Sequence, residues 1–267
     1  MSHPLPRKSC RDHGFTLVEI LVVIGIVVVL AVISFSSGRM LLTRARIIES
    51  TENLRSLAIA NTTYAADYGV YCPHSDQSNI HRWHGSRKSV DAKFDPTTGY
   101  LSPYLGKSAR VTTCPLFKAM VVGSPSFEDS TGGYGYNAAY IGGLPGGSFD
   151  SKTKIQISER PANVPNPGQT VMFTTAAYAR PSGLQESAEC VPPFWDYGSG
   201  PSNTRPSPTV HFRANGKALV AWCDGSVTAE AKNTSSPGLN PHGGDAEKWH
   251  LGWFGPDENN GYWNPKY

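Results

Sequence analysis

The pattern of apolar and polar residues divides the chain into one long amino-terminal helix and a turn-rich remainder. From Ile20 to Ile33 every residue is apolar or glycine, which is typical of a helix covered on all sides by lipid or by other helices. After the weaker patch Ser34–Gly38, apolar residues recur at roughly helical spacing while charged residues occupy the other faces. The pattern therefore predicts one helix with an apolar half over residues 15–35 and an amphipathic half over residues 36–68.

Beyond residue 68 the apolar runs are short and are separated by glycine, proline, asparagine and serine. Asn215-Gly216 is the strongest hairpin signal, Asp224-Gly225 predicts a second turn, and one short helix is expected near Gly99–Gly106. Because no ten-residue helix separates the expected strands, they favour antiparallel pairing. The fold class is then α+β, with the long helix packed on a small antiparallel β-sheet with long loops. The expected strands are Arg110–Thr113, Tyr134–Ile141, Thr170–Ala177, Val210–Arg213, and Ala218–Trp222 continuing to Val227.

Composition indicates a turn-rich domain and weakens the case for one class of partner. The 267 residues leave room for the helix and one domain of about 200 residues, and the 27 glycines and 21 prolines suit many turns. The formal charge of +3 depends on residues 1–14, which hold three of the 24 basic residues and one of the 21 acidic ones. Without them 21 basic residues face 20 acidic ones, so composition gives no support for nucleic-acid binding.

A single carboxylate, Glu19, stands near the start of the apolar segment. A charge in a membrane setting costs several kcal/mol, so this position needs a physical reason. A short basic leader comes first, and the run Gly14-Phe15-Thr16-Leu17-Val18-Glu19 follows it. This order resembles the class III signal of type IV pilins and type II secretion pseudopilins. The resemblance implies that a prepilin peptidase cleaves between Gly14 and Phe15 and methylates the new amino group of Phe15, with Glu19 as the fifth residue of the mature chain.

The resemblance also implies a location, a role and a set of partners. Residues 1–14 would be a cleaved leader, residues 15–35 would span the inner membrane from a cytoplasmic amino terminus, and residues 69–267 would form a periplasmic pilin-like domain. The expected role is a structural, non-enzymatic subunit of a type IV pilus-like or type II secretion pseudopilus filament. The expected partners are the prepilin peptidase, like subunits, the secretion or pilus assembly platform and inner-membrane lipid. The alternative is a membrane-anchored extracytoplasmic domain that binds carbohydrate or protein and uses the signal only for sorting.

Two other interpretations of the apolar segment are open at this point. A secretory signal peptide places its cleavage site after a shorter apolar core, at small residues, and Ala31, Ser34, Ser36 and Ser37 offer such a site. A plain membrane anchor is the second, because the 21 residues from Phe15 to Phe35 are enough for a hydrocarbon core of about 30 Å. Neither interpretation explains Glu19.

A second resemblance concerns the rest of the chain. Thr113-Cys114-Pro115, Tyr134-Gly135-Tyr136-Asn137 and the stretch Asn215–Val227 are similar to elements of the larger pseudopilin-like proteins of planctomycete- and lentisphaera-type bacteria. Those proteins carry a carboxy-terminal His-x9-Asp-Gly signature. In this chain twelve residues, not nine, separate His211 from Asp224-Gly225. The resemblance therefore supports the Asp-Gly turn but assigns no role to His211.

The cysteine count depends on the leader, because Cys10 lies within it and four cysteines follow. An even number in an oxidising compartment favours disulfides, and four cysteines allow three pairings. Near pairs close smaller loops at lower entropic cost, which favours Cys72 with Cys114 and Cys190 with Cys223. Buried free thiols are the alternative.

The carboxy-terminal tail offers a candidate calcium site. Asp257, Glu258, Asn259 and Asn260 place several oxygen atoms on one short turn, as a hard cation requires. Major pseudopilins hold calcium in a carboxy-terminal loop, and the resemblance implies the same use here; a solvated turn is the alternative. Aromatic residues flank this turn, and we expect them to pack the tail on the sheet, with a carbohydrate or subunit contact as the other interpretation. They are Trp253, Phe254, Tyr262, Trp263 and Tyr267.

Other candidate chemistry is sparse. Cys72, His74, His81 and His84 are residue types that ligate zinc, but their spacing matches no standard structural zinc pattern. Ser226 lacks the Gly-x-Ser-x-Gly frame of a hydrolase nucleophile. The sequence therefore predicts no enzymatic activity and no certain cofactor.

Overall fold

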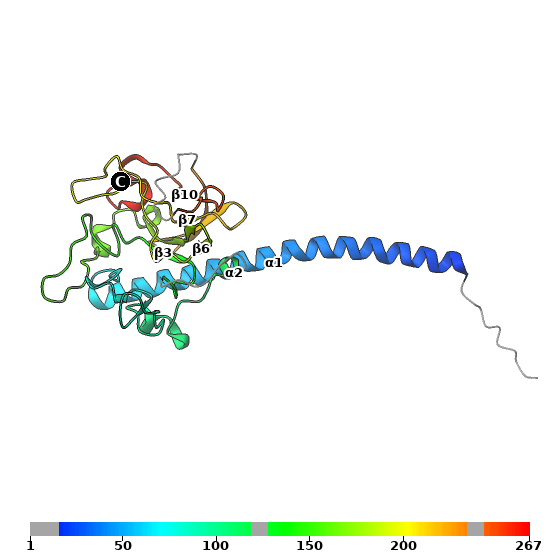
Figure 1. Ribbon diagram of the computed structural model, residues 1–267, viewed down its shortest axis with the longest axis horizontal. Helices are drawn as coiled ribbons and strands as arrows, with labels where there is room; N and C mark the ends of the chain where they lie inside the picture. Colours follow the sequence, from blue (N-terminus) through cyan, green and yellow to red (C-terminus); the bar gives the residue numbers. More distant parts are fainter. Residues whose placement is uncertain (1–15, 119–127, 234–242) are drawn as a thin grey trace, which may run out of the picture. The chain divides into compact units, whose positions relative to one another are not determined.

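One helix, α1, runs from Leu17 to Tyr68 over 52 residues (Figure 1). The computed structural model describes residues 16–118, 128–233 and 243–267. It divides the chain into two compact units, Met1–Ala45 and Arg46–Tyr267. No proline interrupts α1, and the helix stops before Gly69, whose φ of +74° favours glycine and whose N–H donates to the carbonyl of Ala65. The predicted helix is confirmed along its described length.

The described part of the unit Met1–Ala45 consists almost entirely of the first portion of α1. Across the residues that the structure describes, no helix is at once long enough and apolar enough to cross a membrane. The membrane segment expected over residues 15–35 begins at Phe15, which lies outside the described residues, and it stays a prediction.

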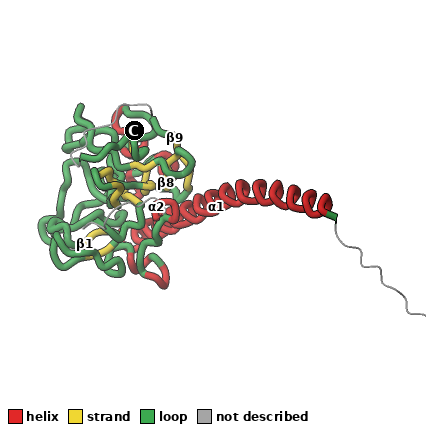
Figure 2. The backbone as a smooth tube through the Cα atoms, turned by 45° about the vertical axis from the view of Figure 1, so that its right-hand side comes forward, coloured by secondary structure: helices red, strands yellow, loops and turns green. Residues whose placement is uncertain are grey.

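The unit Arg46–Tyr267 is built on a four-stranded antiparallel sheet in the order β3-β4-β8-β9. Figure 2 shows the strands in yellow, with β8 and β9 labelled. A β-bulge separates Val171 from Phe173 in the second strand, and Val220 of β8 lies opposite Thr174 on one side and Thr228 on the other. Together with the long helix, this sheet confirms the predicted α+β class. The strands are β3 Tyr134–Tyr136, β4 Val171–Thr175, β8 Lys217–Trp222 and β9 Val227–Ala231.

Three two-stranded antiparallel pairs and several short helices fill the long connections between these strands. The pairs are β1 His81–Arg82 with β2 Gly85–Ser86, β5 Tyr178–Arg180 with β6 Gly183–Gln185, and β7 Val210–His211 with β10 Leu251–Gly252. The helices are α2 Pro115–Lys118 and the 3-10 helices η1 Ser102–Tyr104, η2 Gly106–Ser108, η3 Pro161–Asn163, η4 Pro167–Gln169 and η5 Glu258–Trp263.

Both predicted turns are present. Asn215 and Gly216 have φ of +53° and +77°, and the backbone N–H and carbonyl groups of Ala214 and Lys217 pair around them at 2.9 and 3.1 Å. Such a two-residue turn needs positive φ at both central positions. The second turn, at Asp224-Gly225, joins β8 to β9 as expected.

Four expected elements differ from the structure. Residues 110–113 form no strand and lead directly into α2, and the helix expected over Gly99–Gly106 is two 3-10 turns. The strand expected over Tyr134–Ile141 ends at Tyr136, because the carbonyl of Asn137 accepts the N–H groups of the residues four and five positions later and forms a turn. The expected strand Val210–Arg213 is shortened to β7, which pairs with β10 and stays outside the four-stranded sheet.

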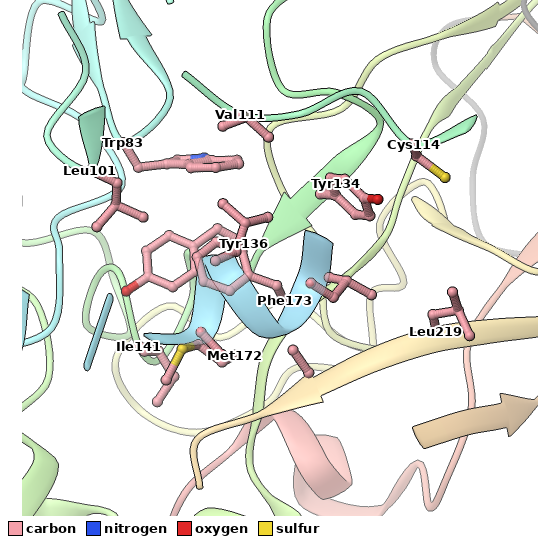
Figure 3. Close-up of a cluster of buried hydrophobic side chains, with 14 of the residues drawn as sticks. Trp83, Leu101, Val111, Cys114, Tyr134, Tyr136, Ile141, Met172, Phe173 and Leu219 are labelled. Carbon is pink, nitrogen blue, oxygen red and sulfur yellow. The ribbon is translucent and has the colours of Figure 1, made fainter. Parts of the chain in front are cut away.

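One face of the sheet packs against the second half of α1 (Figure 3). Leu54, Leu57 and Ala58 are buried, and their spacing of three and four residues places them on one face of the helix. They belong to the same buried cluster as Tyr136 and Phe173, whose rings stack 4.6 Å apart. Burial against the sheet thus explains the amphipathic pattern in this part of α1.

The other face of the sheet is covered by the carboxy-terminal tail. Alternate residues of β8 point to opposite clusters, with Val220 and Trp222 on the tail side. Trp253 and Trp263 of the tail are buried there, and their indole N–H groups donate to the carbonyls of Val191 and Cys190 at 3.1 and 3.0 Å. The expected packing of the aromatic tail on the sheet is present for Trp253, Phe254, Tyr262 and Trp263, whereas Tyr267 is exposed. Strands β3 and β4 and most of β8 are buried, while the edge strand β9 is largely exposed.

This arrangement makes the tail part of the folded core, which a pair of substitutions tests. Trp263→Ala removes a fully buried side chain and should lower the free energy of unfolding by about 3–5 kcal/mol. Tyr267→Ala removes an aromatic ring that is 48% exposed and should change it by less than about 0.5 kcal/mol. Urea unfolding followed by tryptophan fluorescence measures both. Equal effects of the two substitutions would show that the tail does not support the core.

Candidate functional site

The first turn of α1 is closed by a reciprocal contact between Thr16 and Glu19. The N–H and the hydroxyl of Thr16 each donate to Oε2 of Glu19 at 2.8 Å, and the N–H of Glu19 donates back to Oγ1 of Thr16 at 3.3 Å. This is a capping box, which satisfies N–H groups that the first turn of a helix otherwise leaves unpaired. The sequence carries the usual signal of this motif, the Thr-x-x-Glu spacing, but the expectations above do not include it.

The helix that follows presents apolar side chains with no protein cover. Every described leucine, isoleucine and valine from Leu17 to Ile33 is exposed, from 48% at Ile20 to 81% at Leu17. A helix that is apolar around its whole circumference requires an apolar surrounding, either lipid or other helices. The first unit therefore combines one carboxylate, held at the helix end, with a surface suited to burial by partners.

The residues of the predicted cleavage lie outside this description. Gly14 and Phe15 belong to residues 1–15, so the structure gives no geometry for the scissile bond. Of the three predicted processing and assembly residues, the structure places Glu19 alone, at the third helical position after the Thr16 cap.

Comparison with known proteins identifies the same segment. The family model of the prokaryotic N-terminal methylation motif matches residues 9–35, a range that contains Gly14, Phe15 and Glu19. The chain carries this class III signal, which is consistent with a pilin- or pseudopilin-like protein, and the predicted resemblance is confirmed. Neither the curated proteins nor the solved structures give a match.

The cysteines require a correction. Cys72, Cys114, Cys190 and Cys223 are all buried free thiols, so the predicted pairings of Cys72 with Cys114 and of Cys190 with Cys223 are not formed. Each lies in its own packing environment. The thiol of Cys72 donates to the carbonyl of Pro73. Cys190 belongs to the buried cluster on the tail side of the sheet, whereas Cys223 belongs to the buried cluster on the α1 side. Sequence separation favoured near pairs, but packing decides which thiols can meet.

Three of the four thiols are held in their protonated form. Burial raises the pKa of Cys72, of Cys223 and, to about 12, of Cys190, and a protonated thiol is a poor nucleophile and metal ligand. Cys114 differs. Burial alone would raise its pKa, but Arg213, a hydrogen bond with Ser50 at 3.2 Å and the first N–H groups of α2 lower it below its usual value. Its thiol is nevertheless fully buried, so it has no access to a substrate.

The predicted calcium ligands also require a correction, because the structure divides them among separate contacts. Asp257 forms an ion pair with Arg205. Asn260 is fully buried; its amide donates to Tyr140 at 2.8 Å and to the carbonyl of Phe194 at 2.9 Å, and its oxygen accepts the N–H of Phe194. Glu258 and Asn259 remain exposed. The four side chains therefore do not form one ligand set, and Asn260 instead holds the tail to the domain.

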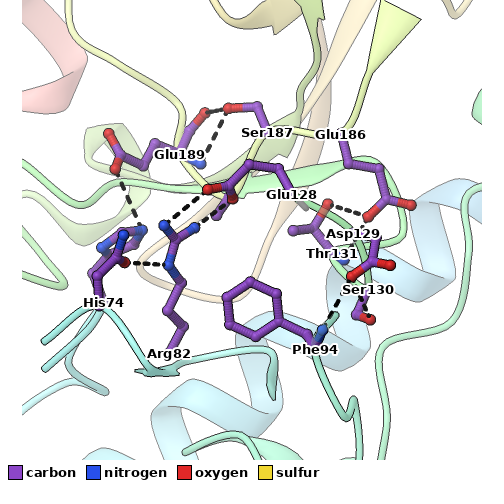
Figure 4. A network of polar contacts seen from close by, with 12 residues as sticks. His74, Arg82, Phe94, Glu128, Asp129, Ser130, Thr131, Glu186, Ser187 and Glu189 are labelled. Atoms are coloured by element: carbon purple, nitrogen blue, oxygen red, sulfur yellow. Dashed lines mark hydrogen bonds and ion pairs between the residues drawn. The ribbon is translucent and has the colours of Figure 1, made fainter. Parts of the chain in front are cut away.

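The zinc-ligating residue types do not converge either. Among the residues that the structure describes, no group of three or more histidine, cysteine, aspartate or glutamate side chains could hold a metal ion. His74 instead belongs to a polar network that no sequence pattern indicates (Figure 4). Its Nε2 lies 3.6 Å from Oε1 of Glu189, and nearby the guanidinium of Arg82 pairs through two hydrogen bonds with Glu128 and donates to Asn79 at 2.7 Å.

Several histidines are buried without a charge partner. His84 is fully buried and packs against Phe94, with ring centroids 4.7 Å apart; neither ring nitrogen has a hydrogen-bond partner among the described residues. His211, the histidine of the weaker resemblance, accepts a hydrogen bond from Arg213 at its Nδ1 if that nitrogen is unprotonated. Burial, with neighbouring Arg82 for His84 and Arg213 for His211, lowers both pKa values well below the usual range. These histidines are neutral parts of the core.

The lowered histidine pKa values predict acid sensitivity with a definite sign. Below pH 6.5 the unfolded chain protonates each histidine while the folded chain does not, so stability falls with pH by about 1.4 kcal/mol per unit for each histidine. His84→Phe keeps an aromatic ring at this site and should remove about one such slope between pH 6 and 4.5. The control Val90→Ala changes a 47% exposed side chain that carries no titratable group and should leave the slope unchanged. Urea unfolding at several pH values measures the slopes, and a wild-type slope in His84→Phe would contradict the assignment.

Proposed function

We propose that this chain is a structural subunit of a filament of the type IV pilus or type II secretion pseudopilus kind. The observation that carries the proposal is the coincidence of the methylation motif over residues 9–35 with a helix whose apolar surface has no cover of its own. In a monomer this surface needs lipid, and in a filament it can be buried by identical helices. One segment then serves both membrane storage and assembly.

The proposed route has three steps. The prepilin peptidase removes residues 1–14 and methylates Phe15, the product stays in the inner membrane with its domain in the periplasm, and an assembly platform adds it to a filament. Glu19 gives the filament its register, because the carboxylate in an apolar bundle pairs with the amino group of Phe15 in a neighbouring subunit. The role is structural rather than catalytic, which fits the use of the buried His84 and Asn260 in packing.

Processing is tested at the cleavage site. Gly14→Arg replaces the smallest residue before the cut and should leave the precursor uncleaved when the chain is coexpressed with a prepilin peptidase. Ser9→Ala, in the same leader, should leave cleavage unchanged. Amino-terminal sequencing of the membrane-bound protein should find methylated Phe15. A terminus near Ser37 would instead assign the segment to a secretory signal peptide.

The assembly step is tested at Glu19. Glu19→Leu should leave membrane insertion and cleavage largely intact, because it removes a charge from the apolar segment, and should reduce filament incorporation by at least tenfold. Glu19→Asp should be intermediate, since its carboxylate is one methylene shorter. Immunoblots of sheared filaments, normalised to the membrane pool, measure incorporation. Glu49→Leu changes an exposed carboxylate further along α1 and should have a much smaller effect.

A second variant separates the charge of Glu19 from its contribution to the helix cap. Thr16→Val removes the hydroxyl of the capping box and keeps the carboxylate, so it should retain most of the incorporation. Loss of incorporation in Thr16→Val equal to that in Glu19→Leu would mean that the cap, and not the charge, directs assembly.

A further inference from the structure

The unit Arg46–Tyr267 contains a cleft that the proposed filament role does not use. Its volume is about 500 Å³, and none of its lining residues belongs to α1. Its lining residues lie within residues 74–82, 138–149 and 189–197, together with Gln156. A cavity of this size is in the range that holds small organic ligands.

Two aromatic side chains line this cleft and are left exposed by the fold. Trp195 is 38% exposed and Tyr197 is 68% exposed. The segment that carries them is nevertheless firmly held: the N–H of Trp195 donates to the carbonyl of Thr204 at 3.0 Å, and its carbonyl accepts the N–H of Ser202 at 2.7 Å. Exposed aromatic rings on a backbone that is fixed on both sides are arranged for contact with a ligand at little cost in conformational entropy.

The residue between the two aromatics fixes the backbone that carries them. Asp196 accepts the N–H groups of Gly198 and Gly200 at 2.9 and 3.1 Å through one carboxylate oxygen and the hydroxyl of Tyr140 at 2.9 Å through the other. Its carbonyl accepts the N–H of Gly146 from the opposite wall. Gly146 has φ of +83°, and a Cβ there would approach the carbonyl oxygen of Tyr197 to 3.0 Å, so the two loops meet closely at this point.

The charged groups that line the cleft are already compensated. Arg82 pairs with Glu128, and Asp76 accepts hydrogen bonds from the backbone N–H groups of Ile80 and His81 at 2.8 and 3.1 Å. Burial lowers the pKa of His74 to about 3, so its imidazole is neutral, and burial raises the pKa of Glu189. With Arg82 paired and His74 neutral, the cleft offers an anionic ligand no free cationic partner and favours a neutral ligand over an anionic one.

One polar group in the cleft still lacks a partner. His74 is 5% exposed and lines the cavity, and its Nε2 has no hydrogen-bond partner among the described residues. The nearest carboxylate oxygen, on Glu189, lies 3.6 Å away, beyond hydrogen-bond distance. A ligand hydroxyl group placed between them could form hydrogen bonds with both His74 and Glu189.

The geometry points to a binding site for a neutral oligosaccharide. The weakly positive C–H face of a sugar ring packs on the negative face of an aromatic ring such as Trp195 or Tyr197. Its hydroxyl groups are at once donors and acceptors, which suits His74, Glu189 and the amide of Gln156. This function goes beyond filament assembly: the subunit would carry a sugar-binding cleft on its globular domain.

The test uses the full-length protein, purified in unassembled form in lauryldimethylamine oxide, a detergent without a sugar head group. The probes are four neutral hexasaccharides, namely the β-1,4-linked oligomers of glucose, N-acetylglucosamine and mannose and the α-1,4-linked oligomer of glucose. Saturation-transfer NMR and calorimetry should find at least one that binds with a Kd below 1 mM. A hexamer of galacturonic acid, which is anionic, should bind at least tenfold more weakly than the best neutral probe.

Substitutions then locate the site. Trp195→Ala should raise the Kd of the best probe at least tenfold, and Tyr197→Ala at least threefold. Tyr267→Ala removes an exposed aromatic ring outside the cleft and should leave the Kd unchanged. Circular dichroism checks that each variant is folded; if Trp195→Ala is not, Tyr197→Ala, whose ring is mostly in solvent, decides the question.

Three results would overturn the proposal: no binding by any of the four neutral probes, an unchanged Kd in Trp195→Ala and Tyr197→Ala, or tighter binding of the anionic hexamer. Loss of filament incorporation in Trp195→Ala without any sugar binding by the wild type would assign the aromatics to a subunit contact. Because binding is measured on unassembled protein, failure of the filament proposal would leave this test unaffected.

Discussion

The second half of α1 is the support on which the globular domain is built. A small sheet of four short strands cannot bury both of its faces alone, and here one face depends on Leu54, Leu57 and Ala58 of the helix. The same helix continues, without a break, into a segment whose apolar residues are exposed in the chain by itself. One covalent element thus has to satisfy two surroundings, a folded core at one end and an apolar environment at the other. Its sequence divides accordingly into a striped half and a uniformly apolar half.

Sequence patterns predicted the elements that depend on local or periodic signals. The helix, the α+β class, the positive-φ turn at Asn215-Gly216 and the turn at Asp224-Gly225 all follow from residue spacing or from backbone conformations that favour glycine and asparagine. The class III signal belongs to the same group, because its meaning lies in the order of adjacent residues.

The contacts that sequence could not predict join residues far apart in the chain. Arg82 meets Glu128, His74 lies near Glu189, and the amide of Asn260 reaches Phe194. No periodicity marks such pairs, because each side chain looks like an ordinary surface residue until the fold buries it. The predicted disulfides and the predicted calcium site failed for this reason: proximity in sequence was used where packing decides, and the candidate ligand Asn260 is needed inside the core.

Glu19 shows how a charge in an apolar segment can be tolerated at two stages. The N–H and the hydroxyl of Thr16 both donate hydrogen bonds to the same carboxylate oxygen of Glu19, Oε2. These two bonds compensate that oxygen within the chain itself. The other oxygen, Oε1, has no partner among the described residues. Removal of residues 1–14, as proposed above, would create an ammonium group at Phe15, four residues before Glu19 in the sequence and free to meet the carboxylate of a neighbouring subunit. A neighbouring cation can therefore bind Oε1 while the cap on Oε2 persists, so that docking adds an interaction without first breaking one. The capping box would then hold the Glu19 carboxylate in position for assembly. The free-energy cost of a carboxylate in an apolar segment would be lowest at the subunit register that pairs it with the ammonium group of a neighbour.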